Sequence, residues 1–296
     1  MTRSVRTAVL QIEVDIAGPQ DGAPVLVLHG WPDAPRGWQP VRERLHEAGW
    51  RTVAPSLRGS GATRFLDADT PRDAQASALA QDAVDLLDAL GIESCPVVGH
   101  DWGARTAYTL AALFPHRVTA IAALALAFQP RGAFAVPGFS QARRFWYQWL
   151  MCFDQGADAV ARDPVGFARA QWETWSPPGW YDEAEFAATA RSFGNPDWVP
   201  VTLNNYRARF LAGEARDPRY DALAGRLAQI DRIGVPALML QGAEDYCDEP
   251  ASSEGFEDCF TGGYRREVID AVGHFPHREA PGQVADAVIE HLRAHC

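Results

Sequence analysis

Short apolar runs of strand length alternate with longer helical patterns along most of the chain. This alternation predicts a mostly parallel β-sheet with helices on both faces, because each parallel strand needs a crossover before the next one. Residues 1–17 are expected to add antiparallel strands at one edge. The strand-like runs are 25–28, 52–54, 95–98, 121–126, 237–240 and 267–269.

Three helices are expected around these runs. Pro71 should start the first, in which leucines and alanines recur at helical spacing until Gly91 ends it. A second follows Gly103 and ends before Pro115. A last one follows Pro281, with its apolar residues on one face.

Residues 129–226 break this rhythm. They contain no strand-like run, are rich in proline and glycine, and carry six of the ten tryptophans. A helical, aromatic-rich insertion after a strand suits a cap over the strand ends, where open α/β sheets bind ligands. We therefore predict a core of residues 1–128 and 227–296 with a helical cap at 129–226. Packing onto the core is the simpler explanation for most of the cap tryptophans.

The composition narrows the choice of partners. The 296 residues carry a net charge of −11; nucleic acids and anionic membranes need basic patches, so neither is expected to bind. Five cysteines without CxxC spacing predict free thiols in a reducing cytoplasm. The first residues lack the apolar core of a signal peptide, and no stretch is long enough to span a bilayer, so we expect a soluble cytoplasmic protein.

The segment 97–103 carries the most specific chemical signal. It reads Val-Val-Gly-His-Asp-Trp-Gly, with a predicted strand before it and a helix after it. In this context G-x-D-x-G matches a nucleophile elbow, a strained turn that presents its central side chain, here Asp101, at the edge of the sheet. The backbone N–H of Trp102 lies at the start of the helix, where it can stabilise an oxyanion.

Two further candidates follow in the chain order of nucleophile, acid and histidine. Asp245 comes after the run 237–240, and His274 comes after the run 267–269. An acid at Asp245 would orient the imidazole of His274 and stabilise its charged form. Asp248 is the alternative acid.

The first core strand ends in the segment 28–32, which reads Leu-His-Gly-Trp-Pro. The backbone N–H of Trp31 is expected to be the second oxyanion donor, and Pro32 is expected to hold the loop through a cis peptide bond. An ordinary glycine–proline turn would look the same in this stretch alone.

An aspartate in place of a serine changes the chemistry. A serine that attacked an sp³ carbon would form an ether, which water does not readily cleave. A carboxylate forms an ester, which a histidine-activated water can hydrolyse at its carbonyl. Asp101 together with His274 therefore indicates hydrolysis by alkyl transfer, on an epoxide or an alkyl halide, and disfavours ester and amide hydrolysis.

These features resemble the epoxide hydrolase and dehalogenase branch of the α/β-hydrolases over nearly the whole chain. The matching motifs are HGWP at 29–32, LRGSG at 57–61, GHDWG at 99–103 and GH at 273–274. The resemblance implies an α/β-hydrolase fold with an inserted helical cap.

Two short segments of the expected cap look like those of epoxide hydrolases. The WYQ stretch at 146–148 resembles the one in which a tyrosine followed by glutamine faces the nucleophile, and the NYR stretch at 205–207 resembles the one that supplies a second tyrosine. By this resemblance Tyr147 and Tyr206 act on the epoxide oxygen, with aromatic packing as the alternative. Three further side chains are expected to contact the substrate: His29, Gln148 and Trp149.

The leaving group separates the two activities. Epoxide opening creates an alkoxide that needs a proton or a strong hydrogen bond, which paired tyrosine hydroxyls can give. Halide departure needs N–H donors, for which Trp102 and Trp149 are the candidates. We predict an epoxide hydrolase, with a dehalogenase of the haloalkane or fluoroacetate type as the alternative.

Both dehalogenase types fit less well. Haloalkane dehalogenases often have an asparagine directly after the His-Gly, where this chain has Trp31. Fluoroacetate dehalogenases carry arginines one and four residues after the nucleophile, which here are Trp102 and Arg105, and they place the acid just before the cap, whereas residues 118–153 contain no acidic residue. We expect Arg105 to be structural, paired with a carboxylate or packed on its helix.

No metal, nucleotide or organic cofactor is implied, because water is the only co-substrate. His277 completes H-x-x-H with His274 but lacks a nearby carboxylate ligand set, so a metal site is not predicted. We expect a small hydrophobic substrate and a monomer or homodimer. A catalytically dead relative that binds ligands or acts as a scaffold is disfavoured, because neither the histidine nor the acid is lost.

Overall fold

The computed structural model of the protein describes residues 2–296 and is built around a nine-stranded sheet. The strands are β1 (Thr2–Arg6), β2 (Leu10–Ala17), β3 (Pro24–Leu28), β4 (Arg51–Pro55), β5 (Arg64–Phe65), β6 (Cys95–His100), β7 (Val118–Leu124), β8 (Ala237–Gly242) and β9 (Tyr264–Ile269). Their order is β1-β2-β4-β3-β6-β7-β8-β9, with β5 paired to β2. The pairs from β4–β3 to β8–β9 are parallel, and β1 and β2 pair antiparallel at one edge, as predicted.

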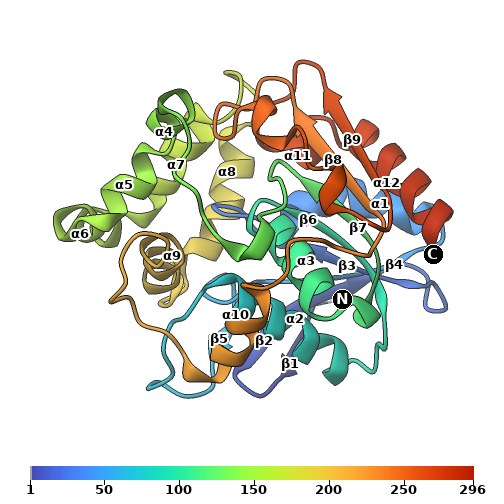
Figure 1. The fold of residues 1–296 in the computed structure, drawn as a ribbon, viewed down its shortest axis with the longest axis horizontal. Helices are drawn as coiled ribbons and strands as arrows, with labels where there is room; N and C mark the ends of the chain where they lie inside the picture. Colours follow the sequence, from blue (N-terminus) through green and yellow to red (C-terminus); the bar gives the residue numbers. More distant parts are fainter. Residues whose placement is uncertain (1) are drawn as a thin grey trace.

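Helices cover both faces of the sheet (Figure 1). Successive residues of a strand point to opposite faces. In β3, Val25 and Val27 pack in one cluster with residues of α1 (Gln39–Glu47) and α12 (Pro281–His295). Leu26 and Leu28 pack in the other, with residues of α2 (Ala76–Ala89) and α3 (Trp102–Leu113). The uninterrupted apolar strands in the sequence follow from this burial on two sides.

The start of α2 differs from the prediction. The helix begins at Ala76 rather than at Pro71, because residues 71–75 are held against α9 (Trp198–Arg207). The N–H of Ala74 donates to the side chain of Asn204 at 2.8 Å, and the side chain of Asn205 donates to the carbonyl of Ala74 at 2.6 Å. These tertiary hydrogen bonds replace the first helical turn.

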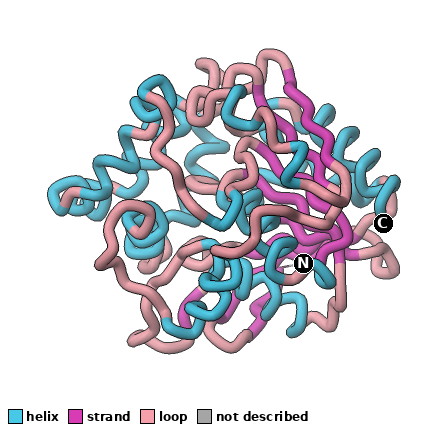
Figure 2. Tube along the Cα trace, in the orientation of Figure 1, coloured by secondary structure: helices cyan, strands magenta, loops and turns pink. Residues whose placement is uncertain are grey.

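The segment between β7 and β8 contains helices and loops and, within the described chain, no strand of the sheet (Figure 2). Its helices are α4 (Phe139–Arg144), α5 (Trp146–Cys152), α6 (Asp154–Arg162), α7 (Pro164–Thr174), α8 (Glu183–Ala190), α9 and α10 (Asp221–Leu227). Its 3-10 turns are η3 (Pro130–Gly132), η4 (Arg191–Gly194) and η5 (Pro218–Tyr220). α4 to α9 gather on one side of the sheet in Figure 1. α10 instead packs against α2 and α3 of the core.

The remaining elements are short. They are η1 (Pro35–Trp38), η2 (Pro115–Arg117), η6 (Pro250–Ser253), η7 (Glu257–Cys259) and α11 (Pro276–Glu279). Among residues 2–296 there is no helix with the length and apolar character that crossing a membrane requires.

Candidate active site

Asp101 lies at a sharp turn between β6 and α3. Its φ of 50° is in the left-handed region, which costs energy for a residue with a side chain. The flanking glycines make the turn possible: a Cβ at Gly99 would lie 2.3 Å from the backbone of Gly103, and one at Gly103 would lie 2.3 Å from the carbonyl oxygen of Leu28. The G-x-D-x-G pattern thus has the steric basis that the sequence suggested.

One of the two predicted backbone donors, the N–H of Trp31, forms a hydrogen bond with the carboxylate of Asp101. The N–H of Trp31 donates to Asp101 Oδ1 at 2.7 Å, and Trp31–Pro32 is a cis peptide bond. Burial raises the pKa of Asp101, while His274, the N–H groups of Trp31 and Trp102, and the charge of Arg105 oppose that rise. One carboxylate oxygen is therefore held by backbone N–H, and the other is left for chemistry.

His274 connects Asp101 with Asp245. Its Nδ1 lies 2.9 Å from Asp245 Oδ2, and its Nε2 lies 3.9 Å from Asp101 Oδ2, too far for a direct hydrogen bond. Nε2 has no hydrogen-bond partner among the described residues. Burial lowers the pKa of His274, but the charges of Asp245, Asp101 and Asp248 outweigh it and raise the pKa to about 9. The carboxylate of Asp245 therefore orients the imidazole of His274, and the unbonded Nε2 faces the carboxylate of Asp101.

The structure also separates the two candidate acids. Asp245 is buried and accepts hydrogen bonds from the N–H groups of Cys247 and Asp248 and from Gln241, in addition to its contact with His274. Asp248 lines the cavity beside Asp101, where burial and the charge of Asp245 raise its pKa to about 7. The geometry therefore matches Asp245, and not Asp248, to the position next to the imidazole.

The two predicted tyrosines meet in one cavity of about 310 Å³ with Asp101. The rings of Tyr147 (α5) and Tyr206 (α9) are 5.4 Å apart and nearly perpendicular. Gln148 donates to the hydroxyl of Tyr147 at 3.0 Å, and the indole N–H of Trp102 donates to the hydroxyl of Tyr206 at 3.1 Å. Each phenol oxygen thus accepts a hydrogen bond from the protein. The hydroxyl of Tyr147 also lies 3.7 Å from Cys247 Sγ, a contact in which either atom can donate.

Three predicted substrate contacts have different outcomes. Gln148 lines the cavity, but its amide is bonded to Tyr147 and to Arg209. Trp149 is not among the lining residues of this cavity, and its indole N–H donates to the carbonyl of Ala142 at 2.8 Å. His29 is also outside the lining of this cavity, and its two ring nitrogens bond the backbone of Gly30 and Leu57.

Arg105 does not have the structural partner that we expected. Within residues 2–296 its guanidinium forms no ion pair or hydrogen bond, and it lines the cavity of Asp101 together with Arg209. The side chain of Arg105 lies on the face of α3 that lines the cavity. The spacing of residues in the sequence did not predict this orientation.

A clamp on the histidine loop was missed in the sequence. Glu279 accepts the N–H of Gly273 at 2.7 Å and that of Phe275 at 2.9 Å, and the hydroxyl of Ser176 donates to Glu279 at 2.7 Å. Trp175 adds an edge-to-face contact with the His274 ring at 4.8 Å. No motif marks these residues, since they come together only through tertiary packing.

A buried polar cluster supports the loop from behind. His100 lies 2.7 Å from the carbonyl of His274 through Nε2, and His277 lies 2.9 Å from Asp33 through its own Nε2. The side chains of three buried residues could in principle bind a metal ion, because their ligand atoms lie within 4.8 Å of one another: Asp33, His100 and His277. Both oxygens of Asp33, however, accept hydrogen bonds from the guanidinium of Arg278, so this charge is already neutralised. The donor set fits a structural ion pair and not a metal site.

Comparison with known proteins agrees with this geometry. The family described as the alpha/beta hydrolase fold matches residues 23–281. Epoxide hydrolase A of Mycobacterium tuberculosis is 30% identical over 98% of this chain and 96% of its own, and epoxide hydrolase 3 of Siraitia grosvenorii is 33% identical over 92% of each. A solved structure of a proposed epoxide hydrolase from Klebsiella pneumoniae has a TM-score of 0.91 at 38% identity, over 99% of this chain and 97% of that one.

The chain therefore belongs to the α/β-hydrolase fold family, within the branch that contains the epoxide hydrolases. Its sheet order, its strand-to-helix elbow and its coverage of these relatives all agree. The predicted fold class and the prediction of a hydrolase are confirmed.

Proposed function

We propose that this protein opens epoxides to vicinal diols through a covalent ester on Asp101. The observation that carries the proposal is the meeting in one cavity of two phenols and a carboxylate that lies beside a histidine–aspartate pair. This set supplies a nucleophile, an acid for the alkoxide and a base for water. The named activities of the relatives support the same choice.

In the first step, Asp101 Oδ2 attacks a ring carbon of the epoxide. A new C–O ester bond forms, and the bond from that carbon to the ring oxygen breaks. The developing alkoxide takes a proton from Tyr147 or Tyr206, and the second hydroxyl donates a hydrogen bond. Oδ2 is the free oxygen in this scheme, because Oδ1 is held by the N–H of Trp31.

In the second step, water attacks the ester carbonyl carbon of Asp101. Esterification of Asp101 removes one of the carboxylate charges that raise the pKa of His274, so Nε2 can accept the water proton in this step, and Asp245 stabilises the imidazolium. Negative charge develops on Oδ1, where the N–H of Trp31 stabilises it, and the N–H of Trp102 also favours a charged carboxyl group at Asp101. The bond from the carbonyl carbon to Oδ2 then breaks. The second proton of the water goes to Oδ2, which completes the diol and leaves Asp101 as a carboxylate, and the proton on His274 returns to the tyrosinate.

The inserted segment 129–226 serves as the cap of this site in the proposal. It supplies both phenols and Gln148, and Trp31 of the core is packed against Tyr147, Tyr206 and Trp175 of the segment. These aromatic contacts keep water away from the nucleophile during the first step. A small organic molecule fits the cavity of about 310 Å³.

Dehalogenation is the weaker candidate. The two indole N–H groups expected for a halide are already donated, that of Trp102 to Tyr206 and that of Trp149 to Ala142. Trp175 has an unbonded indole N–H among the described residues, but its ring does not line the cavity. A halide at Asp101 would therefore find phenols rather than the expected pair of indoles.

The test is a matched panel of substrates. The purified protein should form a diol from styrene oxide, and should release no halide from chloro- and bromoalkanes of similar size or from fluoroacetate. Asp101→Ala is the control that removes enzymatic turnover. Halide release from any of these compounds without diol formation from epoxides would establish the dehalogenase instead.

A further inference from the structure

A second cavity, of about 270 Å³, adjoins the one that holds Asp101. The two cavities share lining residues, among them Arg105, Phe128, Phe134 and Arg209. A ligand bound at Asp101 can therefore extend past these side chains into the second space. The two chemical steps described above use no residue that lines only this second cavity.

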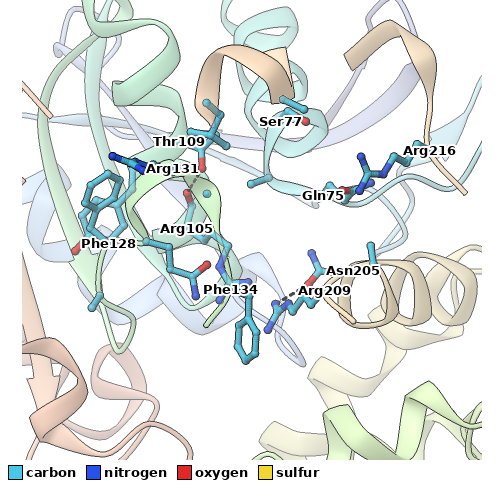
Figure 3. Close-up of a pocket in the computed structure, with 18 residues that line it drawn as sticks. Gln75, Ser77, Arg105, Thr109, Phe128, Arg131, Phe134, Asn205, Arg209 and Arg216 are labelled. Carbon is cyan, nitrogen blue, oxygen red and sulfur yellow. Dashed lines mark hydrogen bonds between the residues drawn. The ribbon is translucent and has the colours of Figure 1, made fainter. Parts of the chain in front are cut away.

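Four arginines line the second cavity (Figure 3). They come from separate segments: Arg105 from α3, Arg131 from η3, Arg209 after α9, and Arg216 before η5. Among the described residues, no aspartate or glutamate lines it. Because the chain as a whole carries a net charge of −11, this concentration of positive charge does not follow from composition. A cavity with such a lining attracts anions.

One of the four arginines has a carboxylate partner: Arg131 lies 3.6 Å from Asp231 in an exposed ion pair. Within residues 2–296, the guanidinium groups of Arg105 and Arg216 form no hydrogen bond or ion pair. Arg209 donates only to the neutral amide oxygens of Gln148 at 3.1 Å and Asn205 at 2.8 Å. Burial and the charge of Arg105 lower the pKa of Arg209 to about 10. A guanidinium removed from water without a carboxylate is costly, and a bound anion would offset that cost.

We propose that the second cavity binds an anionic group, a carboxylate or a similar monoanion, at the end of the epoxide substrate remote from the ring. The inference rests on the proposed epoxide hydrolysis and specifies its substrate class. Asp101 and Asp248 line only the first cavity, and Arg131 and Arg216 line only the second, while Arg105 and Arg209 line both. This polarity directs the negative end of an acidic epoxide away from the nucleophile. Phe128 and Phe134 provide an apolar wall for the connecting chain.

The spacing of the two ends sets the size of the substrate. Arg105 lies one helical turn beyond Asp101 on α3, and its N–H donates to the carbonyl of Asp101 at 2.9 Å. The guanidinium of Arg209 lies over the ring of Tyr206, 4.6 Å from its centroid. A helical turn rises about 5.4 Å. Because Arg131 and Arg216 line only the second cavity, an anion held there needs a linker of several atoms that passes Arg105 and Arg209.

The first experiment compares kcat/KM for terminal epoxides of graded chain length that end in a carboxylate with the same compounds as primary amides. The wild type should prefer the best carboxylate over its amide by ~10-fold or more, and added salt should reduce the preference. Arg216→Gln should lower kcat/KM for the carboxylate and leave the amide unaffected. Arg143→Gln, a change at an exposed arginine outside both cavities, should leave both unchanged.

The second experiment measures binding of saturated alkanoates and alkanamides, which carry no epoxide, by calorimetry. The alkanoate should bind to the wild type and lose ~10-fold or more in affinity in the double variant Arg209→Gln, Arg216→Gln. Equal kcat/KM for carboxylate and amide in the wild type, or alkanoate binding that the double variant leaves intact, would overturn the anion site. Arginine-dependent alkanoate binding without turnover of any epoxide would instead overturn the proposed reaction and uphold the site.

Discussion

The hydroxyl oxygen of Ser176 accepts the backbone N–H of His274 at 2.9 Å. Ser176 belongs to the inserted helical segment, whereas His274 belongs to the loop after β9 of the core. A Cβ on the neighbouring Gly273 would lie 2.3 Å from this hydroxyl, so the contact is closely packed. The segment that supplies the phenols therefore also fixes the loop that supplies the base.

Ser176→Ala should slow turnover without weakening substrate binding. The buried N–H of His274 would lose its acceptor, which costs about 1–3 kcal/mol in stability, and a displaced imidazole should lower kcat by about tenfold or more. KM should stay near that of the wild type. Thr174→Ala is the matched control, because that hydroxyl bonds only the carbonyl of Ala170 in its own helix. A rise in KM with unchanged kcat would contradict a positioning role for Ser176.

Removal of one phenol should slow ring opening but not abolish it. Each hydroxyl stabilises the developing alkoxide, so Tyr147→Phe or Tyr206→Phe should cost ~2–4 kcal/mol in the alkylation step. Rapid-quench measurement of the ester separates this step from hydrolysis. The double variant should be nearly inactive in alkylation. Tyr181→Phe, in the same segment but outside the cavity, should react like the wild type; wild-type alkylation in the double variant would rule out the phenols.

Stability should fall as pH rises toward 9. Burial opposes protonation of His274, yet Asp245, Asp101 and Asp248 raise its pKa to about 9. An unfolded histidine has a pKa of about 6.5, so the folded state binds this proton more tightly. The stabilisation is complete below about pH 6.5 and is lost as pH rises through about 9, by roughly 3 kcal/mol. Urea unfolding at a series of pH values measures it.

Two variants check the origin of that pH dependence. His274→Gln should flatten the curve between about pH 6.5 and 9. Asp248→Asn should change the pH dependence of stability at lower pH. Burial and the charge of Asp245 raise the pKa of Asp248 to about 7, so the stability that its proton contributes is lost as pH rises to that value. Stability that rises between about pH 6.5 and 9 in the wild type would contradict the raised pKa of His274.

The elbow and the triad geometry could be predicted because each residue lies in the segment that follows a strand: Asp101 after β6, Asp245 after β8 and His274 after β9. The carboxyl ends of parallel strands lie at one edge of the sheet. Recognition of the strands therefore predicts that the loops with Asp101, Asp245 and His274 lie close together. The cis peptide before Pro32 and the donor role of the Trp31 N–H depended on the same edge.

The sequence predicts less where the face of a helix or a contact between distant segments determines the surroundings of a side chain. Tyr147 and Trp149 are two residues apart on α5, so they lie on different faces and cannot both face one cavity. The clamp of Ser176 and Glu279 joins segments far apart in the chain. Likewise, four arginines from four segments line one cavity only after folding. The spacing of residues in the sequence does not predict such tertiary contacts.

The central claim is the ester on Asp101, and a single turnover in ¹⁸O-labelled water tests it most directly. Enzyme in excess over epoxide is allowed one turnover, and the peptide that contains Asp101 and the diol are then analysed by mass spectrometry. Because water attacks the carbonyl carbon of Asp101, the label should enter this peptide, and the first diol should carry an unlabelled oxygen from Oδ2. Asp101→Ala should show no label in the peptide. Label in the first diol, with none in the Asp101 peptide, would mean direct attack by water on the epoxide and would contradict the account.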